Sequence, residues 1–157
     1  MVNNLDDVLS SKSSWDGATI EHFLSDARQP LRLATINAAG FPQVTSLWFA
    51  FTGGALWCCT QQNSLVSKHI QREGRVGFEA AVNEPPYLGV SGYGTAQVLH
   101  EDATELLKTL AARYLSSGNT PLQHWLMSRI ATEVVIKVVP RHVTSWDFSG
   151  RMTSNTG

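Results

Sequence analysis

Residues 31–60 read LRLATINAAG FPQVTSLWFA FTGGALWCCT, and this stretch decides the fold class of the chain. Apolar and polar residues alternate along much of it, which is the period of a β-strand with one buried face. Gly40 and the pair Gly53-Gly54 interrupt the alternation, and short glycine turns of this kind join antiparallel neighbours. The stretch therefore predicts three strands in a β-meander, at residues 31–37, 42–52 and 55–60.

The rest of the chain adds helices and three further strands. Helical spacing of apolar residues predicts helices at 19–28, 63–73 and 103–114 and one more that begins at Thr120, with Thr19 and Thr120 as N-caps of the first and last. Alternation predicts strands at 75–82, 87–99 and 132–139, and 143–148 is a candidate for the continuation of the last. Strands do not alternate one for one with helices, so a doubly wound parallel sheet is disfavoured. We expect a mainly β (α+β) fold, a mostly antiparallel barrel with surrounding helices.

Size and composition limit the classes of function. The chain has 157 residues, 43% of them hydrophobic and only 16% charged, with a formal net charge of −1. We therefore expect one domain over 1–157 with loosely ordered tails at 1–17 and 150–157, and a large hidden surface such as a subunit interface. A near-neutral chain has no general attraction for nucleic acid, and no apolar run is long enough to span a membrane. No export signal is seen, so a cytoplasmic location is expected.

The glycines of the 87–99 strand and the scattered polar residues suggest no well-known site. Gly92 and Gly94 superficially resemble a dinucleotide-binding loop, but they lie within a strand rather than between a strand and a helix, so they indicate a bulge or a close backbone approach. The histidines show no spacing typical of a zinc site, so no metal is expected. No acid–base pair stands out, and the catalytic residues are unknown. Of the adjacent Cys58 and Cys59, one should face the core and the other could line a pocket.

The segment from Cys59 to Ile70 is more informative. A strand ends at Cys59-Thr60, and Asn63 and Ser64 begin a helix that carries Lys68. Hydroxyl, amide and main-chain N–H groups at a helix N-terminus suit an anion such as phosphate. An ordinary helix capped by Asn63 or Ser64 is the other interpretation, and it is the more common one.

Several short motifs occur in an order that resembles the pyridoxamine 5'-phosphate oxidase-like, FMN-binding split-barrel family. The motifs are Leu33-Ala34-Thr35, Gly40-Phe41-Pro42-Gln43, Leu47-Trp48-Phe49, Cys59-Thr60, Lys68 to Arg72, Gly74-Arg75-Val76, Gly92 to Ala96, Val138 to Val143, and Trp146-Asp147. The resemblance covers about residues 18–148. It implies a six-stranded antiparallel split β-barrel with surrounding helices, assembled as a homodimer with the flavin at the subunit interface.

The resemblance also implies a cofactor site. The second strand would run along the flavin ring through Val44, Thr45, Ser46 and Leu47. The phosphate would lie at Cys59, Thr60, Asn63, Ser64 and Lys68, and Trp146 would approach the flavin from the partner subunit. The implied function is that of an FMN-binding oxidoreductase acting on a small-molecule substrate or electron donor that the sequence does not name.

Two departures from the family pattern qualify this expectation. Val66 and Ser64 occupy positions that are often basic in the family, so phosphate binding should be weaker. Arg32 or Arg75 is a candidate to replace the missing contact. The segment from Arg141 to Trp146 does not match the substrate motif of true pyridoxamine 5'-phosphate oxidase, so that enzyme itself is disfavoured. The alternatives are a non-catalytic flavin or haem binding or storage protein and a deazaflavin-dependent reductase.

Overall fold

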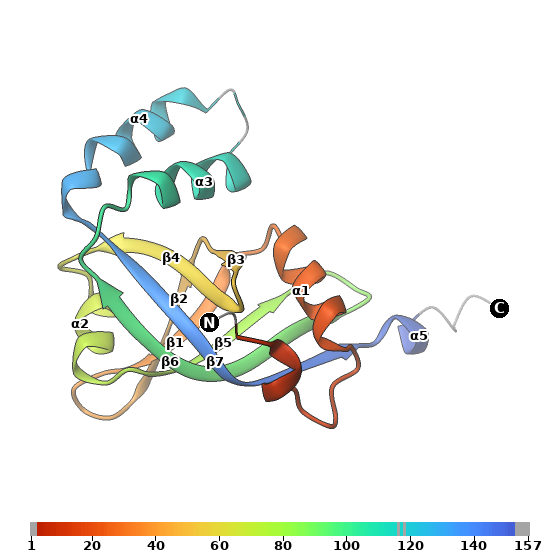
Figure 1. The fold of residues 1–157 in the computed structure, drawn as a ribbon. Coiled ribbons are helices and arrows are strands. Elements are labelled where there is room, and N and C mark those ends of the chain that lie inside the picture. The colour runs from red at the N-terminus through yellow and green to blue at the C-terminus, as the bar shows by residue number, and fades with distance from the viewer. Residues whose placement is uncertain (1–2, 116, 118, 153–157) are drawn as a thin grey trace.

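The computed structural model describes residues 3–115, 117 and 119–152 of the chain. The strands are β1 (Leu31–Ile36), β2 (Pro42–Leu47), β3 (Ala50–Thr52), β4 (Ala55–Gln61), β5 (Arg75–Ala81), β6 (Leu88–Leu99) and β7 (Glu133–Asp147). The α-helices are α1 (Gly17–Asp26), α2 (Leu65–Arg72), α3 (Thr104–Tyr114), α4 (Thr120–Ser128) and α5 (Ser149–Met152). Two 3-10 helices, η1 (Leu5–Val8) and η2 (Ile130–Thr132), complete the described part. Figure 1 shows the strands wrapped around one another, with α3 and α4 side by side beyond one end of the sheet.

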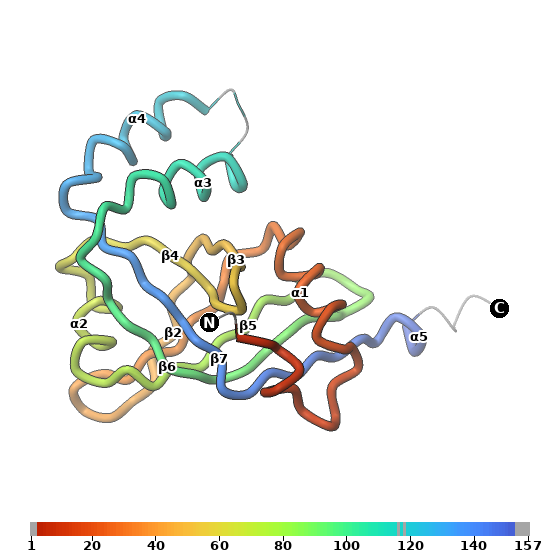
Figure 2. Tube along the Cα trace, in the orientation of Figure 1, coloured from red at the N-terminus to blue at the C-terminus, as the bar shows by residue number. Residues whose placement is uncertain are grey.

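The strands form one antiparallel sheet that curls into a split barrel. Its order is β2-β1-β5-β6-β7-β4-β3, so β2 and β3 stand at opposite ends. Only Trp48 and Phe49 separate these two strands in the chain, and the sheet must therefore curl until its ends meet. The tube in Figure 2 follows this curl from β2 round to β4. The expected antiparallel split barrel is confirmed.

The barrel has seven strands rather than the expected six, because the strand predicted over 42–52 breaks. Phe49 is fully buried at the break, and its main-chain N–H and C=O lie 3.4 and 3.5 Å from the Tyr114 hydroxyl of α3. Trp48 stacks on the Tyr114 ring with the centroids 5.3 Å apart. The expected meander is divided accordingly: β2 pairs with β1, and β3 pairs with β4.

Glycine allows β6 to pass close to β7. A Cβ atom on Gly92 would lie 2.2 Å from the carbonyl oxygen of His142, and one on Gly94 would lie 2.2 Å from that of Val139. The pairing register shifts between Tyr93 and Gly94, which is the bulge that the glycines predict. The bulge bends both long strands and so helps the sheet to close.

The start of the chain differs from the expected loose lead-in. Leu5 is buried, Trp15 packs on Phe23, and the Ser13 and Ser145 hydroxyls lie 2.8 Å apart. These contacts attach residues 4–16 to α1 and β7. Although the segment is mostly polar in sequence, its few apolar side chains pack against the core of the barrel. Of the expected loose tail at 150–157, residues 150–152 belong to α5 and residues 153–157 lie outside the described residues.

Two of the expected helix caps are wrong. Asp16, not Thr19, is the N-cap of α1, and its carboxylate accepts the Thr19 N–H at 2.8 Å. This hydrogen bonding also lowers the pKa of Asp16. Asn119 precedes α4 without a side-chain cap bond, so Thr120 lies inside that helix. A carboxylate accepts from a helix N-terminus more strongly than a hydroxyl does, which explains the choice at α1.

Candidate functional site

The four residues predicted to run along a cofactor ring lie on β2, at one end of the sheet. Val44 and Ser46 point outward and are exposed, whereas Thr45 and Leu47 face the barrel and are half-buried. Arg32 of the neighbouring β1 donates from Nη1 to the Ser46 hydroxyl at 3.0 Å. In the described part of the chain β1 is the strand neighbour of β2, so the other edge of β2 presents main-chain donors and acceptors.

The outward surface beside β2 has small residues at its centre. Val44 is paired with Ala34 of β1, which in turn is paired with Gly77 of β5. Val44 is 68% exposed, whereas Ala34 and Gly77 are partly exposed. A row of small apolar side chains on an open sheet face can support a planar ring.

A pocket of about 230 Å³ joins the end of β2 to Cys59 on β4. Its lining is Ser46, Leu47, Trp48, Cys59, Leu107, Leu110, Leu126 and Glu133. Cys58 is fully buried, so the expectation that one cysteine faces the core and the other lines a pocket is confirmed. Burial raises the pKa of the Cys59 thiol to about 12, and the Glu133 carboxylate adds to the rise. This thiol is therefore neutral at physiological pH and is not an activated nucleophile.

The start of α2 is an ordinary capped helix. Ser64 is the N-cap, its hydroxyl accepts the Ser67 N–H at 3.1 Å, and the Thr60 hydroxyl donates to it at 3.0 Å. Asn63 and Lys68 are exposed. The structure thus brings Thr60 and Ser64 together, but their hydroxyls bond within the chain.

Val66, at the position where the family often has a basic residue, is only 5% exposed and belongs to the hydrophobic core. The side chain at this position points inward, so it does not contribute to a phosphate site at the surface. Nothing described at the start of α2 replaces the missing charge apart from Lys68.

Trp146 lies apart from the other predicted residues within the chain. It stands near the end of β7 opposite Gly89 of β6, whereas Thr60 of β4 pairs with Val134 at the beginning of β7. A Cβ atom on Gly89 would lie 2.8 Å from Cζ2 of Trp146, so the indole covers this glycine. The prediction that Trp146 approaches a cofactor from a partner subunit remains a prediction.

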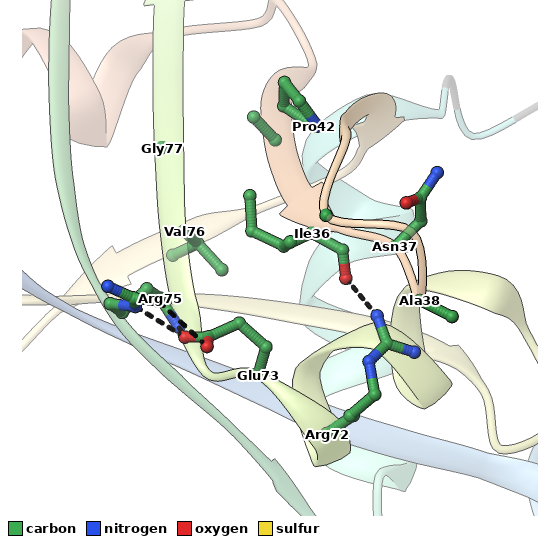
Figure 3. A pocket seen from close by; sticks show the side chains of 11 residues that line it. Ile36, Asn37, Ala38, Pro42, Arg72, Glu73, Arg75, Val76 and Gly77 are labelled. Carbon is green, nitrogen blue, oxygen red and sulfur yellow. Dashed lines mark hydrogen bonds and ion pairs between the residues drawn. The ribbon is translucent and has the colours of Figure 1, made fainter.

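A larger cleft, of 710 Å³, lies at the beginning of β2 (Figure 3). Its lining combines small or apolar residues with charged ones: Ala34, Ile36, Asn37, Ala38, Gly40, Pro42, Arg72, Glu73, Arg75, Val76 and Gly77. The site that the family resemblance implies does not include this cleft, and of its charged residues only Arg75 is a candidate from the sequence, as a replacement for the missing basic contact. The cleft forms only where β1, β2, β5 and the end of α2 come together in the fold. In the sequence, the charged residues around Gly74 are the one local feature that indicates it.

Hydrogen bonds order the charged wall of the cleft. Arg72 donates from Nη2 to the Ile36 carbonyl oxygen at the end of β1. Arg75 donates from Nε and Nη2 to the two Glu73 carboxylate oxygens at 2.7 and 3.1 Å. These bonds lower the pKa of Glu73 and raise that of Arg75, so the carboxylate and the guanidinium stay charged.

These residues fit a planar cofactor that carries a phosphate. The outer row of β2, β1 and β5 offers a support of small apolar residues, and the cleft at its end offers guanidinium groups, which suit phosphate. No three His, Cys, Asp or Glu side chains within residues 3–115, 117 and 119–152 are grouped to hold a metal ion. No helix among those residues is long and apolar enough to cross a membrane.

Comparisons with known proteins give the family. A protein-family model described as pyridoxamine 5'-phosphate oxidase matches residues 18–147. The search against curated proteins found no match. Among solved structures, a conserved hypothetical protein of Mycobacterium tuberculosis superposes with a TM-score of 0.75 at 24% identity, covering 95% of each chain.

Two further structures show the same fold at lower identity. One, described as an F420 reductase, has a TM-score of 0.63 at 22% identity and covers 77% of this chain and 93% of its own. The other, the haem storage protein HutZ of Vibrio cholerae, has a TM-score of 0.63 at 14% identity and covers 83% of this chain and 92% of its own. At these identities the two likenesses show the fold alone. The family model spans most of the chain, and on that ground the chain belongs to the pyridoxamine 5'-phosphate oxidase family of split barrels.

Proposed function

We propose that the protein is an FMN-binding oxidoreductase, related to pyridoxamine 5'-phosphate oxidase but different from that enzyme in substrate. One observation carries the proposal: the open outer row of β2, β1 and β5 leads directly into a cleft of 710 Å³ that contains arginines. The ring of FMN needs an apolar support, and its phosphate needs cationic side chains close to that support. Ligand pockets of this size are typical of small-molecule and cofactor sites.

The residues of this chain would bind and orient the cofactor. When bound, FMN supplies the hydride and electron transfer, and the protein positions the ring and adjusts its electronic properties. Val44 and Ala34 would lie under the ring, and the free edge of β2 around Thr45 would offer main-chain hydrogen bonds. The half-buried Leu47 and Cys59 line the separate pocket beyond the end of β2 and are not assigned to the ring. We assign no acid or base.

The proposal includes a homodimer in the cytoplasm, with the flavin between subunits and Trp146 supplied by the partner. The low charged fraction of 16% and the exposed Val44, Phe41 and Tyr93 support a covered sheet face. Sedimentation at micromolar concentration tests this part, since a monomer under those conditions would contradict it.

A deazaflavin is the second candidate cofactor. The observation in its favour is the burial of Val66, which takes away the usual basic group at the start of α2. A fold match to a protein described as an F420 reductase agrees with this choice. Haem binding without turnover is the non-catalytic candidate, and the likeness to HutZ makes it worth testing.

The visible absorption spectrum of the purified protein, before and after addition of FMN, tests the proposal first. A bound flavin spectrum, followed by reduction with NADH or NADPH and reoxidation by an acceptor, is the expected result. A Soret band with added haem and no flavin binding would favour the storage protein. Binding of F420 but not FMN would select the deazaflavin. Absence of turnover with a panel of electron donors, despite bound flavin, would leave a carrier rather than an enzyme.

A further inference from the structure

The cleft of Figure 3 has a cationic wall formed by Arg72 and Arg75, of which only Arg75 is a candidate from the sequence. Arg72 ends α2, Arg75 begins β5, and Glu73 lies between them in the figure. Two guanidinium groups against one carboxylate leave an excess of one positive charge among the three side chains. The wall therefore favours an anion, with Glu73 as a competitor for Arg75.

Hydrogen bonds within the chain fix both guanidinium groups, and these bonds use only some of their N–H donors. A guanidinium carries five N–H donors. Arg72 uses Nη2 on the Ile36 carbonyl oxygen, which ties the end of α2 to the end of β1. Arg75 uses Nε and Nη2 on Glu73, whose carboxylate also accepts the Arg75 main-chain N–H at 3.1 Å. Because these bonds restrict the side chains, less conformational entropy is lost when an anion binds.

The opposite rim of the cleft is a rigid hairpin. The Asn37 side-chain oxygen accepts the main-chain N–H groups of Ala39 and Phe41, each at 3.0 Å. Gly40 has a φ of 86°, a conformation that favours glycine. The hairpin thus keeps a fixed shape, and the amide nitrogen of Asn37 adds a neutral donor to the lining.

The apolar floor connects the cleft with the ring-supporting row. Pro42 lines the cleft and is paired with Ile36, and Val44 lies two residues further along β2. Two residues of a strand span about 7 Å, so a ring over Val44 lies about that far from the Pro42 edge of the cleft. The start of α2 is a different place: the helix has eight residues, and its two ends are about 12 Å apart.

We propose that Arg72 and Arg75 bind the phosphate of the flavin or deazaflavin cofactor, at the C-terminal end of α2 rather than at its N-terminal end. This inference rests on the proposed function. At the N-terminal end Val66 is buried, and Ser64 and Thr60 are bonded within the chain. In this chain the phosphate contacts therefore lie in the cleft and not at the helix start, where its family often has basic residues.

The test compares FMN with riboflavin, which is the same ring and side chain without the phosphate. Each ligand is titrated by flavin fluorescence into the wild type, the double variant Arg72→Gln/Arg75→Gln, Lys68→Gln and Glu73→Gln. In the wild type FMN should bind about tenfold or more tightly than riboflavin, as expected for charge-assisted bonds to phosphate. The double variant should remove this preference and leave riboflavin affinity unchanged, which also shows that it is folded. Glu73→Gln should strengthen FMN binding a few-fold by releasing Arg75.

Lys68→Gln is the matched control, because it removes one exposed charge at the other half of the same helix. It should leave the FMN preference intact. Loss of the preference in Lys68→Gln but not in the double variant would overturn the inference and leave the proposed function standing. Equal affinities for FMN and riboflavin in the wild type would also overturn it.

A deazaflavin ligand is distinguished by the same variants, using F420 and the deazaflavin chromophore that lacks the phosphate. A preference for F420 that the double variant removes would support the phosphate site with that cofactor. If neither flavin nor deazaflavin binds the wild type, the proposed function fails, and the inference fails with it.

Discussion

Arg113 near the end of α3 should be one of the main residues that hold the helical hairpin on the barrel. Its guanidinium donates to three carbonyl oxygens at the end of α1, those of Leu24, Ser25 and Ala27, at 2.7, 2.6 and 2.6 Å. It also lies 5.0 Å from the ring centroid of the fully buried Phe49. The last carbonyls of a helix have no partner within the helix, and a cation at that end is favourable.

Replacement by alanine should cost roughly 3.5–4 kcal/mol of unfolding free energy. Three hydrogen bonds contribute about 1 kcal/mol each in this half-exposed setting, and the cation–π contact contributes about 0.5–1 kcal/mol. For a chain of this size about 2–4 °C of melting temperature corresponds to 1 kcal/mol. Arg113→Ala should therefore lower Tm by roughly 7–16 °C.

Calorimetry and urea denaturation measure the effect. Arg113→Lys keeps the charge but loses the planar fork, so it should fall between the wild type and alanine. Lys108→Ala on the same helix is the control, because Lys108 forms an exposed ion pair with Glu105, and its replacement should change the stability by no more than about 0.5 kcal/mol. A Tm for Arg113→Ala within 2 °C of the wild type would refute the role assigned to this side chain.

Three further predictions concern the core and the pocket of Cys59. Val66→Lys should destabilise the fold by about 2–4 kcal/mol in urea denaturation, because Val66 is 5% exposed and a charge there is desolvated. An unchanged stability together with tighter FMN binding would contradict the placement of the Val66 side chain in the core. Thr35→Val should cost about 1–3 kcal/mol, since the Thr35 hydroxyl lies 2.9 Å from Nδ1 of the buried His69, whereas Thr35→Ser, which keeps the hydroxyl, should cost less. Burial and Glu133 raise the pKa of Cys59 to about 12. The neutral thiol therefore contributes its full stabilisation of the folded state below the unfolded-state pKa of about 8.5, and this contribution is lost as the pH rises toward 12. Between pH 8.5 and 10.5 the wild type should lose about 2–3 kcal/mol more than Cys59→Ala, and parallel pH profiles for the two proteins would show that the thiol is not shifted.

Local patterns were sufficient for the type and approximate position of most elements. The strand at Leu31–Ile36, the helix around Lys68 and the long strand containing Gly92 all lie within a few residues of their predicted ranges. Alternation and helical spacing are properties of the chain itself, so they can be recognised without any tertiary contact. The N-cap of α1 was missed because Asp16 and Thr19 are both good caps, and the carboxylate of Asp16 is the stronger acceptor.

The sequence alone determined the antiparallel barrel, the family and the loss of a basic group at Val66. Only the tertiary structure decided what that loss means: Val66 points into the core, and Arg72 and Arg75 line a cleft that strands distant in sequence complete. The break between β2 and β3 was likewise invisible in the alternation, because it depends on Tyr114, a residue far along the chain that stacks on Trp48. A periodic pattern specifies which face of an element is buried, but which residues meet across the barrel depends on how the sheet closes.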